Sequence, residues 1–196
     1  MTEESTEMES PSRGAPRGAS RGGSRGGSFA VAFLGLGANL GDTARTLKQA
    51  CGEIASQNGI TSLQSASLYS SAPVDAPGPH YTNTVVRIHT TLCPLSLLDR
   101  MQAIEKAFGR ERSALDVRNA PRTLDIDLLW FDDLSISVPR LTLPHPRMHQ
   151  RAFVLKPLAE LAGEDFVLQG CPLSHWLEDC RDQTCVAVAP TLSSNE

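Results

Sequence analysis

The chain has 196 residues, a formal net charge of −4 and 40% hydrophobic residues, which is enough for one domain with a proper core. The negative charge argues against a general binder of polyanions. The longest apolar run, residues 29–38, is too short to cross a bilayer. Five cysteines without a CxxC pair predict reduced thiols, so we expect a soluble, cytoplasmic protein with no membrane segment.

The first 28 residues are rich in Arg, Gly and Ser and contain almost nothing to bury. Such a segment cannot offset the entropy lost on ordering, so the sequence predicts a disordered tail over residues 1–28. The tail has no apolar stretch, which argues against a secretory signal, and its glutamates argue against a transit peptide. We expect one folded domain over residues 29–190.

Hydrophobic spacing and turn residues predict the elements of this domain. Strands are expected over residues 29–38, 60–73, 82–92, 122–132 and 184–190. Helices are expected from Asp42 to residue 57, from residue 95 to about Gly109, after a loop within residues 141–163, and over residues 172–181. The order predicts an α+β fold with a split, ferredoxin-like βαββαβ core and with helical and strand additions at its C-terminal end.

The first expected strand runs into a glycine-rich turn, FLGLGANLGD, at residues 33–42. Its glycines have the spacing G-x-G-x-x-x-G, one residue longer than the dinucleotide fingerprint, and the Gly-Lys-Ser/Thr of a Walker loop is absent. A glycine-lined turn at the start of a helix still allows a ligand to approach the backbone closely. The sequence therefore leaves the ligand of this turn open.

Asp125 and Asp127 stand two residues apart in the segment APRTLDIDLL. Side chains at this spacing in a strand point the same way, so both carboxylates share one face, while Leu124, Ile126 and Leu128 face the core. Adjacent carboxylates repel each other unless a cation joins them, and Mg²⁺ typically takes one or two carboxylates, waters and substrate phosphates. Exposed surface decoration is the alternative for a lone D-x-D pair.

Basic residues gather in the same region. Eight of the 14 Lys and Arg residues beyond the tail fall between Lys106 and Arg151, and seven of these eight are arginines. The planar fork of arginine grips phosphates bidentately, so the asymmetry favours a localised phosphate site, with Arg122 beside the aspartates. A solvated, salt-bridged face is the alternative.

A proline-braced loop, LTLPHPRMHQRAF, adds further polar side chains. It carries His145, Arg147, His149 and Arg151, and Arg140 precedes it. Tyr81 and Phe153 lie near the predicted functional loops, and two rings can sandwich a flat heterocycle. An ordinary surface loop and core aromatics are the alternatives.

Four potential zinc ligands occur within 15 residues: Cys171, His175, Cys180 and Cys185. Zinc sites usually pair their ligands at tighter spacing, and a helix is expected to intervene here. We therefore favour core or surface positions for these thiols.

Taken together, the chain resembles the 6-hydroxymethyl-7,8-dihydropterin pyrophosphokinase family of folate biosynthesis. The resemblance runs from about Phe29 to Glu164 and more weakly to the last strand, and its most specific part is APRTLDIDLL. Supporting matches are GLGANLG, YTN, IEKAFGRER and LTLPHPRMHQRAFVLKPL.

The resemblance implies transfer of the β,γ-diphosphate of ATP to the hydroxymethyl oxygen of the pterin, with release of AMP. It implies two Mg²⁺ ions with ATP, held by Asp125 and Asp127. The residues that it places at the transferring phosphates are Arg110, Arg112 and Arg122, with Arg110 and Arg122 as the catalytic pair. The other ATP contacts that it implies are Glu105, Arg140, Thr142, His145 and Arg151. The pterin contacts that it implies are Gly37, Ser71, Val74, Tyr81, Asn83 and Phe153.

By the same resemblance the glycine turn lies beside the pterin, where Gly37 lets the backbone approach a flat ring and Asn39 starts the helix turn. Phosphoryl-type transfer needs positioning and charge neutralisation more than a strong base, so no general base is expected. The chain departs from the family pattern at Asn119, where a tryptophan often closes on the pterin, and at Ala72, which replaces a frequent proline. The loop VDAPGPHY looks about one residue short.

Parts of the sequence are compatible with two other functions. An Arg/Gly-rich tail on a ferredoxin-like domain is also found in RNA-binding proteins, but the aromatic strand motif of the RRM is absent, so we expect no nucleic-acid partner. A degenerate pyrophosphokinase kept as a regulator would have lost a key aspartate or arginine, and none is missing. Nothing in the sequence indicates an oligomer interface, so a monomer is the expectation.

Overall fold

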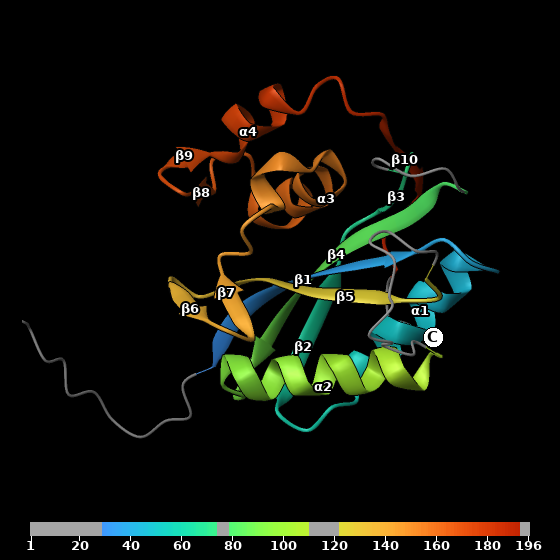
Figure 1. The fold of residues 1–196 in the computed structure, drawn as a ribbon, viewed down its shortest axis with the longest axis vertical. Coiled ribbons are helices and arrows are strands. Elements are labelled where there is room, and N and C mark those ends of the chain that lie inside the picture. The colour runs from blue at the N-terminus through green and yellow to red at the C-terminus, as the bar shows by residue number, and fades with distance from the viewer. Residues whose placement is uncertain (1–28, 74–78, 110–121, 193–196) are drawn as a thin grey trace, which may run out of the picture.

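The computed structural model describes residues 29–73, 79–109 and 122–192. Its centre is a six-stranded antiparallel sheet (Figure 1). The strands are β1 (Ala30–Ala38), β2 (Ile60–Ser65), β3 (Leu68–Ser71), β4 (Tyr81–Thr90), β5 (Asp125–Phe131) and β10 (Cys185–Ala189). Their order is β10-β3-β4-β1-β5, with β2 also paired to β4. The mixed helix and sheet class predicted from the sequence is therefore confirmed.

The strand predicted over residues 60–73 is in fact two strands, β2 and β3, which pair with successive parts of β4. The strand conformation is interrupted at Ala66 and Ser67. Ala66 N–H still donates to the Val85 carbonyl at 2.9 Å, whereas Ser67 N–H donates to a carboxylate oxygen of Glu160 at 2.8 Å. The single-strand prediction was wrong because a distant acid takes the backbone donor at this point.

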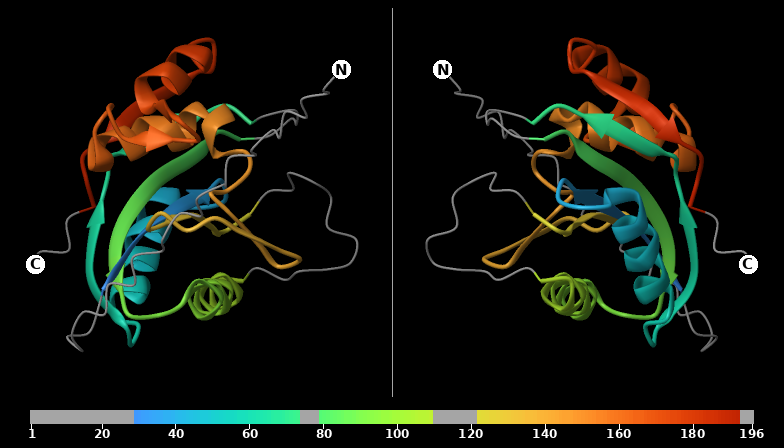
Figure 2. Two further views of the ribbon diagram at one scale, coloured as in Figure 1. Left: turned by 90° about the vertical axis from the view of Figure 1, so that its left-hand side faces the viewer. Right: turned by 90° about the vertical axis from the view of Figure 1, so that its right-hand side faces the viewer.

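Helices cover both faces of the sheet (Figures 1 and 2). On one face lie α1 (Thr43–Ala55) and α2 (Pro94–Ala107), and on the other lie α3 (Ala152–Ala162) and α4 (Leu173–Asp179). Side chains of β1 alternate between the two layers: Leu34 and Leu36 pack in the cluster under α1 and α2, and Phe33 packs in the cluster under α3. The alternation follows from the two-residue period of a strand.

The start of the first helix and the end of the second agree with the sequence-based predictions. Asp42 caps α1, since its side chain accepts a hydrogen bond from Arg45 N–H at 3.1 Å. The end of α2 at Ala107 is followed by Gly109 with φ of 85°, a conformation that favours glycine. No helix in the described ranges is long and apolar enough to span a membrane.

Shorter elements complete the chain. They are the hairpin of β6 (Ile136–Val138) and β7 (Leu141–Leu143), a 3-10 turn at Met148–Gln150, and the pair β8 (Val167–Leu168) and β9 (Cys171–Pro172). The β8–β9 pair was not predicted, because two residues per strand are too few to show an alternating pattern.

Glu160 fastens the α3 layer to the sheet, because its carboxylate accepts from both Ser67 N–H and the Tyr69 hydroxyl. We expect Glu160→Ala to lower the free energy of unfolding by about 1–2 kcal/mol, measured by denaturant titration. Glu178→Ala is the control. It breaks an exposed pair with Arg181 and is expected to cost less than about 0.5 kcal/mol. Equal losses in the two variants would contradict the anchoring role.

Candidate active site

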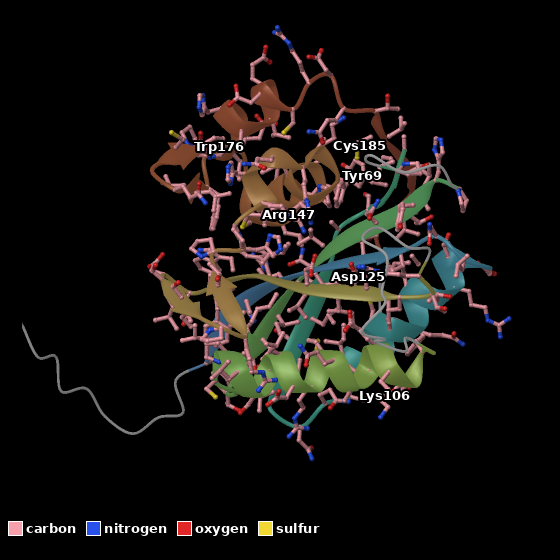
Figure 3. All side chains as sticks on the ribbon, viewed as in Figure 1. Tyr69, Lys106, Asp125, Arg147, Trp176 and Cys185 are labelled. Carbon is pink, nitrogen blue, oxygen red and sulfur yellow. The ribbon has the colours of Figure 1, made fainter. Side chains whose placement is uncertain are left out.

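Asp125 and Asp127 lie half-buried on β5, while Ile126 and Leu128 are buried in the core under α1 and α2. The predicted shared face of the two carboxylates is confirmed by this alternation. Figure 3 shows Asp125 on the side of β5 that faces α3. The two carboxylates therefore lie on the sheet face that α3 covers elsewhere.

The neighbouring strand presents bare backbone beside these aspartates. In the β1–β5 pairing, Gly37 lies opposite Asp125 and Gly35 lies opposite Asp127. On the other side of β1, Gly37 lies opposite Asn83 of β4. A Cβ atom on Gly37 would come within 3.0 Å of Asn83 Oδ1. The glycine is thus needed for the close approach of the Asn83 amide, and it leaves a flat strip between that amide and Asp125.

Asn83 is held in place by a second predicted site residue. Its Nδ2 donates to Ser71 Oγ at 2.9 Å, and both side chains are buried. The structure therefore brings together Gly37 of β1, Asn83 opposite it on β4, and Ser71, which lies diagonally across on β3. Gly37 and Asn83 come from strands that are distant in sequence, so this contact arises from the fold.

Both predicted aromatic residues lie near Ser71, since Tyr81 is opposite it in the β3–β4 pairing and Phe153 shares a cavity with it. Tyr81 begins β4, and its pKa is raised by burial and by the Asp125 carboxylate, with Arg122 acting in the opposite direction. Its hydroxyl is therefore within electrostatic reach of the aspartate and the arginine. Phe153 lies in the first turn of α3 and lines a cavity of about 170 Å³ together with Ser71.

An arginine faces each aspartate. Arg122 Nη1 lies 3.0 Å from Asp125 Oδ2, and Arg151 Nη1 lies 3.8 Å from Asp127 Oδ2. The Arg151 guanidinium also lies 5.5 Å from the centroid of the Phe153 ring. Each of the two carboxylates thus has a guanidinium group within 4 Å, as expected where anionic oxygens and a cation are bound together.

Sequence reasoning missed the role of Asn39. Its buried side-chain Oδ1 accepts from Arg122 N–H at 2.8 Å, and its own N–H donates to the Arg122 carbonyl at 3.2 Å. The expectation that Asn39 starts the helix turn was wrong, because Asp42 caps α1. Asn39 instead clamps the backbone of Arg122. Nothing in the local sequence gives this partner, which is 83 residues away.

Glu105 is 1% exposed, and its Oε1 accepts from Ile126 N–H at 2.9 Å. Ile126 stands between the two aspartates at the edge of the sheet, so this carboxylate of α2 supports the strand that carries them. The ATP contact predicted for Glu105 stays a prediction.

The remaining predicted residues are placed as follows. Arg140 pairs with Asp99 of α2, Thr142 is exposed on β7, and His145 follows β7. Among the described residues, no hydrogen bond or ion pair joins Arg140 or Thr142 to Asp125 or Asp127. Val74, Arg110, Arg112 and Asn119 lie outside the described residues.

The four candidate zinc ligands lie on β9, on α4, after α4 and on β10. The cysteines are free thiols, and His175 faces Asp179 at 3.8 Å. Within residues 29–73, 79–109 and 122–192, no group of three or more His, Cys, Asp or Glu side chains is arranged to hold a metal ion.

His145 has its pKa lowered to about 4, first by desolvation and then by the charges of Arg151 and Arg147. Its Nδ1 accepts from Arg147 N–H at 3.2 Å, which also requires the ring nitrogen to be unprotonated. The imidazole is therefore neutral near pH 7.

This shift predicts a pH dependence of stability. Because the folded protein holds His145 neutral while the unfolded chain protonates it near pH 6.5, the stabilisation is present above that pH and is lost as the pH falls toward 4. In His145→Asn, whose amide oxygen replaces the Nδ1 acceptor, this loss is absent. The free energy of unfolding of both proteins is measured by denaturant titration at a series of pH values. We expect the difference between the wild-type protein and the variant to be constant above pH 7. Between pH 7 and pH 4 it should shift by about 1–3 kcal/mol in favour of the variant. A constant difference throughout would contradict the shift.

The chain matches the sequence model of 7,8-dihydro-6-hydroxymethylpterin-pyrophosphokinase (HPPK) over residues 33–163. Its relatives include the 2-amino-4-hydroxy-6-hydroxymethyldihydropteridine pyrophosphokinases of Synechocystis, 42% identical over 133 residues, and of Pseudomonas aeruginosa, 38% identical over 149 residues. The first match covers 68% of this chain and 67% of the relative, and the second covers 76% and 90%.

Among solved structures, the wild-type HPPK-DHPS of Plasmodium falciparum with pterin and p-hydroxybenzoate is similar with a TM-score of 0.59 at 14% identity. The match covers 79% of this chain but only 44% of that larger protein, and it supports the fold alone. The family match and the identities above are much more specific. On this evidence, the chain belongs to the 7,8-dihydro-6-hydroxymethylpterin-pyrophosphokinase family.

Proposed function

We propose that the face of the sheet bearing Asp125 and Asp127 is where this chain transfers the β,γ-diphosphate of ATP to 6-hydroxymethyl-7,8-dihydropterin. Pyrophosphoryl transfer from ATP to this pterin, in folate synthesis, is the reaction of the family to which the chain belongs. The observation that supports placing the reaction here is that Asp125, Gly37 and Asn83 lie opposite one another on three adjacent strands. It sets a charged half of the site directly beside a flat, amide-lined half.

The donor set at the charged half fits Mg²⁺. Two half-buried carboxylates on one face leave coordination positions for water and phosphate oxygens, which is how this ion is usually held at nucleotides. Asp125 and Asp127 would hold the two ions expected with ATP, and the ions would neutralise charge on the triphosphate. The N–H of Ile126 donates to Glu105, so the strand that carries both aspartates is held at the sheet edge by a carboxylate of α2.

The arginines supply the remaining positive charge. Arg122 and Arg151 already face the two aspartates, and in the proposal their guanidinium groups would bind phosphate oxygens of ATP. Arg110 and Arg112 are proposed at the same phosphates, and the proposed ATP contacts also include Glu105, Arg140, Thr142 and His145. His145 is neutral at pH 7, so its contribution is a hydrogen bond and not a charge.

The flat half of the site suits a pterin ring. Gly37 leaves the backbone open, and the Asn83–Ser71 hydrogen bond fixes the Asn83 amide with Oδ1 toward Gly37, where it can accept from a ring N–H. Tyr81 and Phe153 are proposed to stack on the ring, with Val74 completing the wall. Attack by the hydroxymethyl oxygen would require the ring to lie beside the triphosphate, and the direct pairing of Gly37 with Asp125 supports this placement.

Several wider expectations remain proposals. The order β5-β1-β4-β2, all antiparallel with α1 and α2 on one face, supports a ferredoxin-like βαββαβ core. We propose residues 29–190 as the catalytic domain and a monomer as its state. The five free thiols support a cytoplasmic location.

The first test mixes the purified protein with ATP, Mg²⁺ and 6-hydroxymethyl-7,8-dihydropterin and measures AMP. We expect AMP only when the pterin is present, and a loss of at least about a hundredfold in Asp125→Asn and Asp127→Asn, because the charge on the ligands is removed. Asp165→Asn, an exposed acid in the turn after α3, is the control and should retain full activity. A folded wild-type protein that forms no AMP would refute the proposed function.

Gly37→Ala tests the pterin half separately. The added Cβ atom meets Asn83 Oδ1 at 3.0 Å and covers the open backbone, so we expect the KM for pterin to rise by about tenfold or more while the KM for ATP stays near the wild-type value. The control is Gly52→Ala in α1, where a Cβ meets nothing within 4 Å. It should leave both KM values unchanged and raise the free energy of unfolding by about 0.5–1 kcal/mol. An unchanged pterin KM in Gly37→Ala would argue against this location.

A further inference from the structure

Gln183 lies in the turn between α4 and β10, beyond the residues that match the family model. Its side chain makes two hydrogen bonds to the chain that leads into α3. Gln183 Oε1 accepts from Ala152 N–H at 2.9 Å, and Gln183 Nε2 donates to the Gln150 carbonyl at 2.8 Å. One amide side chain thus holds the backbone immediately before and immediately after Arg151.

The two backbone groups need a partner from elsewhere. Ala152 is the first residue of α3, and the first N–H groups of a helix have no acceptor within it. The N-cap residue, Arg151, makes no side-chain capping hydrogen bond. Gln183 therefore supplies from a distant segment the cap that the local sequence lacks.

Gln183 is itself held firmly. Its backbone N–H donates to the Cys180 carbonyl at 3.0 Å, and Cys185, two residues later, is buried and pairs with Ser71 at the edge of the sheet. Lys156 of α3 donates to the Cys185 carbonyl at 2.7 Å. The two hydrogen bonds from Gln183 to Gln150 and Ala152, which we call the Gln183 clamp, thus connect the start of α3 to a segment that is fixed on both sides.

The residue inside the clamp is the one that faces the site. Arg151 Nη1 lies 3.8 Å from Asp127 Oδ2, and its guanidinium lies 5.5 Å from the ring of Phe153. Gln183 and Thr184 also line the cavity that Ser71 and Phe153 share. A change in the backbone at Arg151 would move this charge relative to the carboxylate pair.

Resting on the function proposed above, we propose that Gln183 is a positioning residue for the reaction. By fixing the peptide groups on both sides of Arg151, it holds the guanidinium where the triphosphate of ATP binds. The C-terminal segment therefore takes part in forming the nucleotide site.

The test compares Gln183→Leu, which removes both hydrogen bonds at similar size, with Gln183→Glu, which keeps the acceptor for Ala152 N–H and loses the donor to Gln150. We expect the KM for ATP to rise about tenfold in Gln183→Leu, with kcat lowered less than about threefold, and a smaller rise in Gln183→Glu. The matched control is Gln57→Leu in the turn just after α1, which packs on the opposite face of the sheet. That glutamine also makes two side-chain hydrogen bonds, to the Glu53 carbonyl and from Arg100.

We expect Gln183→Leu and Gln57→Leu to lower Tm by similar amounts. Because Gln57→Leu should leave the KM for ATP unchanged, a loss of stability alone does not explain a raised KM in Gln183→Leu. A KM for ATP in Gln183→Leu that equals the wild-type value, or an equal rise in Gln57→Leu, would overturn the inference. The binding of Mg²⁺ and α,β-methylene ATP, measured by calorimetry on the same proteins, separates this outcome from failure of the proposed function. If the wild-type protein forms no AMP, the nucleotide analogue still tests the Gln183 clamp. Weaker binding of the analogue by Gln183→Leu, but not by Gln57→Leu, supports the clamp. Binding by Gln183→Leu as tight as that of the wild-type protein overturns it.

Discussion

The pairing of β1 with β4 on one side and β5 on the other is the constraint on which the site depends. Because the register sets Gly37 opposite both Asn83 and Asp125, a residue without a side chain separates the amide from the carboxylate. A shift of one residue would turn each of these groups to the core face, where α1 and α2 pack. The apolar alternation of β1 and β5 that fills the core therefore also fixes the distance between the two halves of the site.

The parts of the structure that short-range patterns govern were predictable. The alternation of Asp125 and Asp127 with Ile126 and Leu128 gave their shared face, and the cap at Asp42 gave the start of α1. The specific segment APRTLDIDLL led to the family, which the comparison confirms. Each of these signals lies within a few consecutive residues, where the spacing of residues along a helix or strand determines the direction in which their side chains point.

The parts that depend on single long-range hydrogen bonds were not predictable. Asn39 holds the backbone of Arg122, Glu160 interrupts the strand at Ser67, and Gln183 caps α3 from the far side of α4. Each is one polar side chain that satisfies one or two backbone groups, and no period in the sequence marks its partner. The glycine turn illustrates the same limit: its composition indicated close approach of some group, but only the sheet register identifies Asn83 as that group.

The buried carboxylate of Glu105 also bears on how copies of this chain meet. Within the described part of the chain, β5 is the last strand on its side of the sheet, and an edge strand with unpaired backbone donors is a template for pairing with another chain. The N–H of Ile126, which would begin such a pairing, is occupied by Glu105 Oε1, and α2 packs along the same strand. The interaction that supports the aspartates thus also occupies one of the backbone donors through which a strand of another chain would pair with this edge.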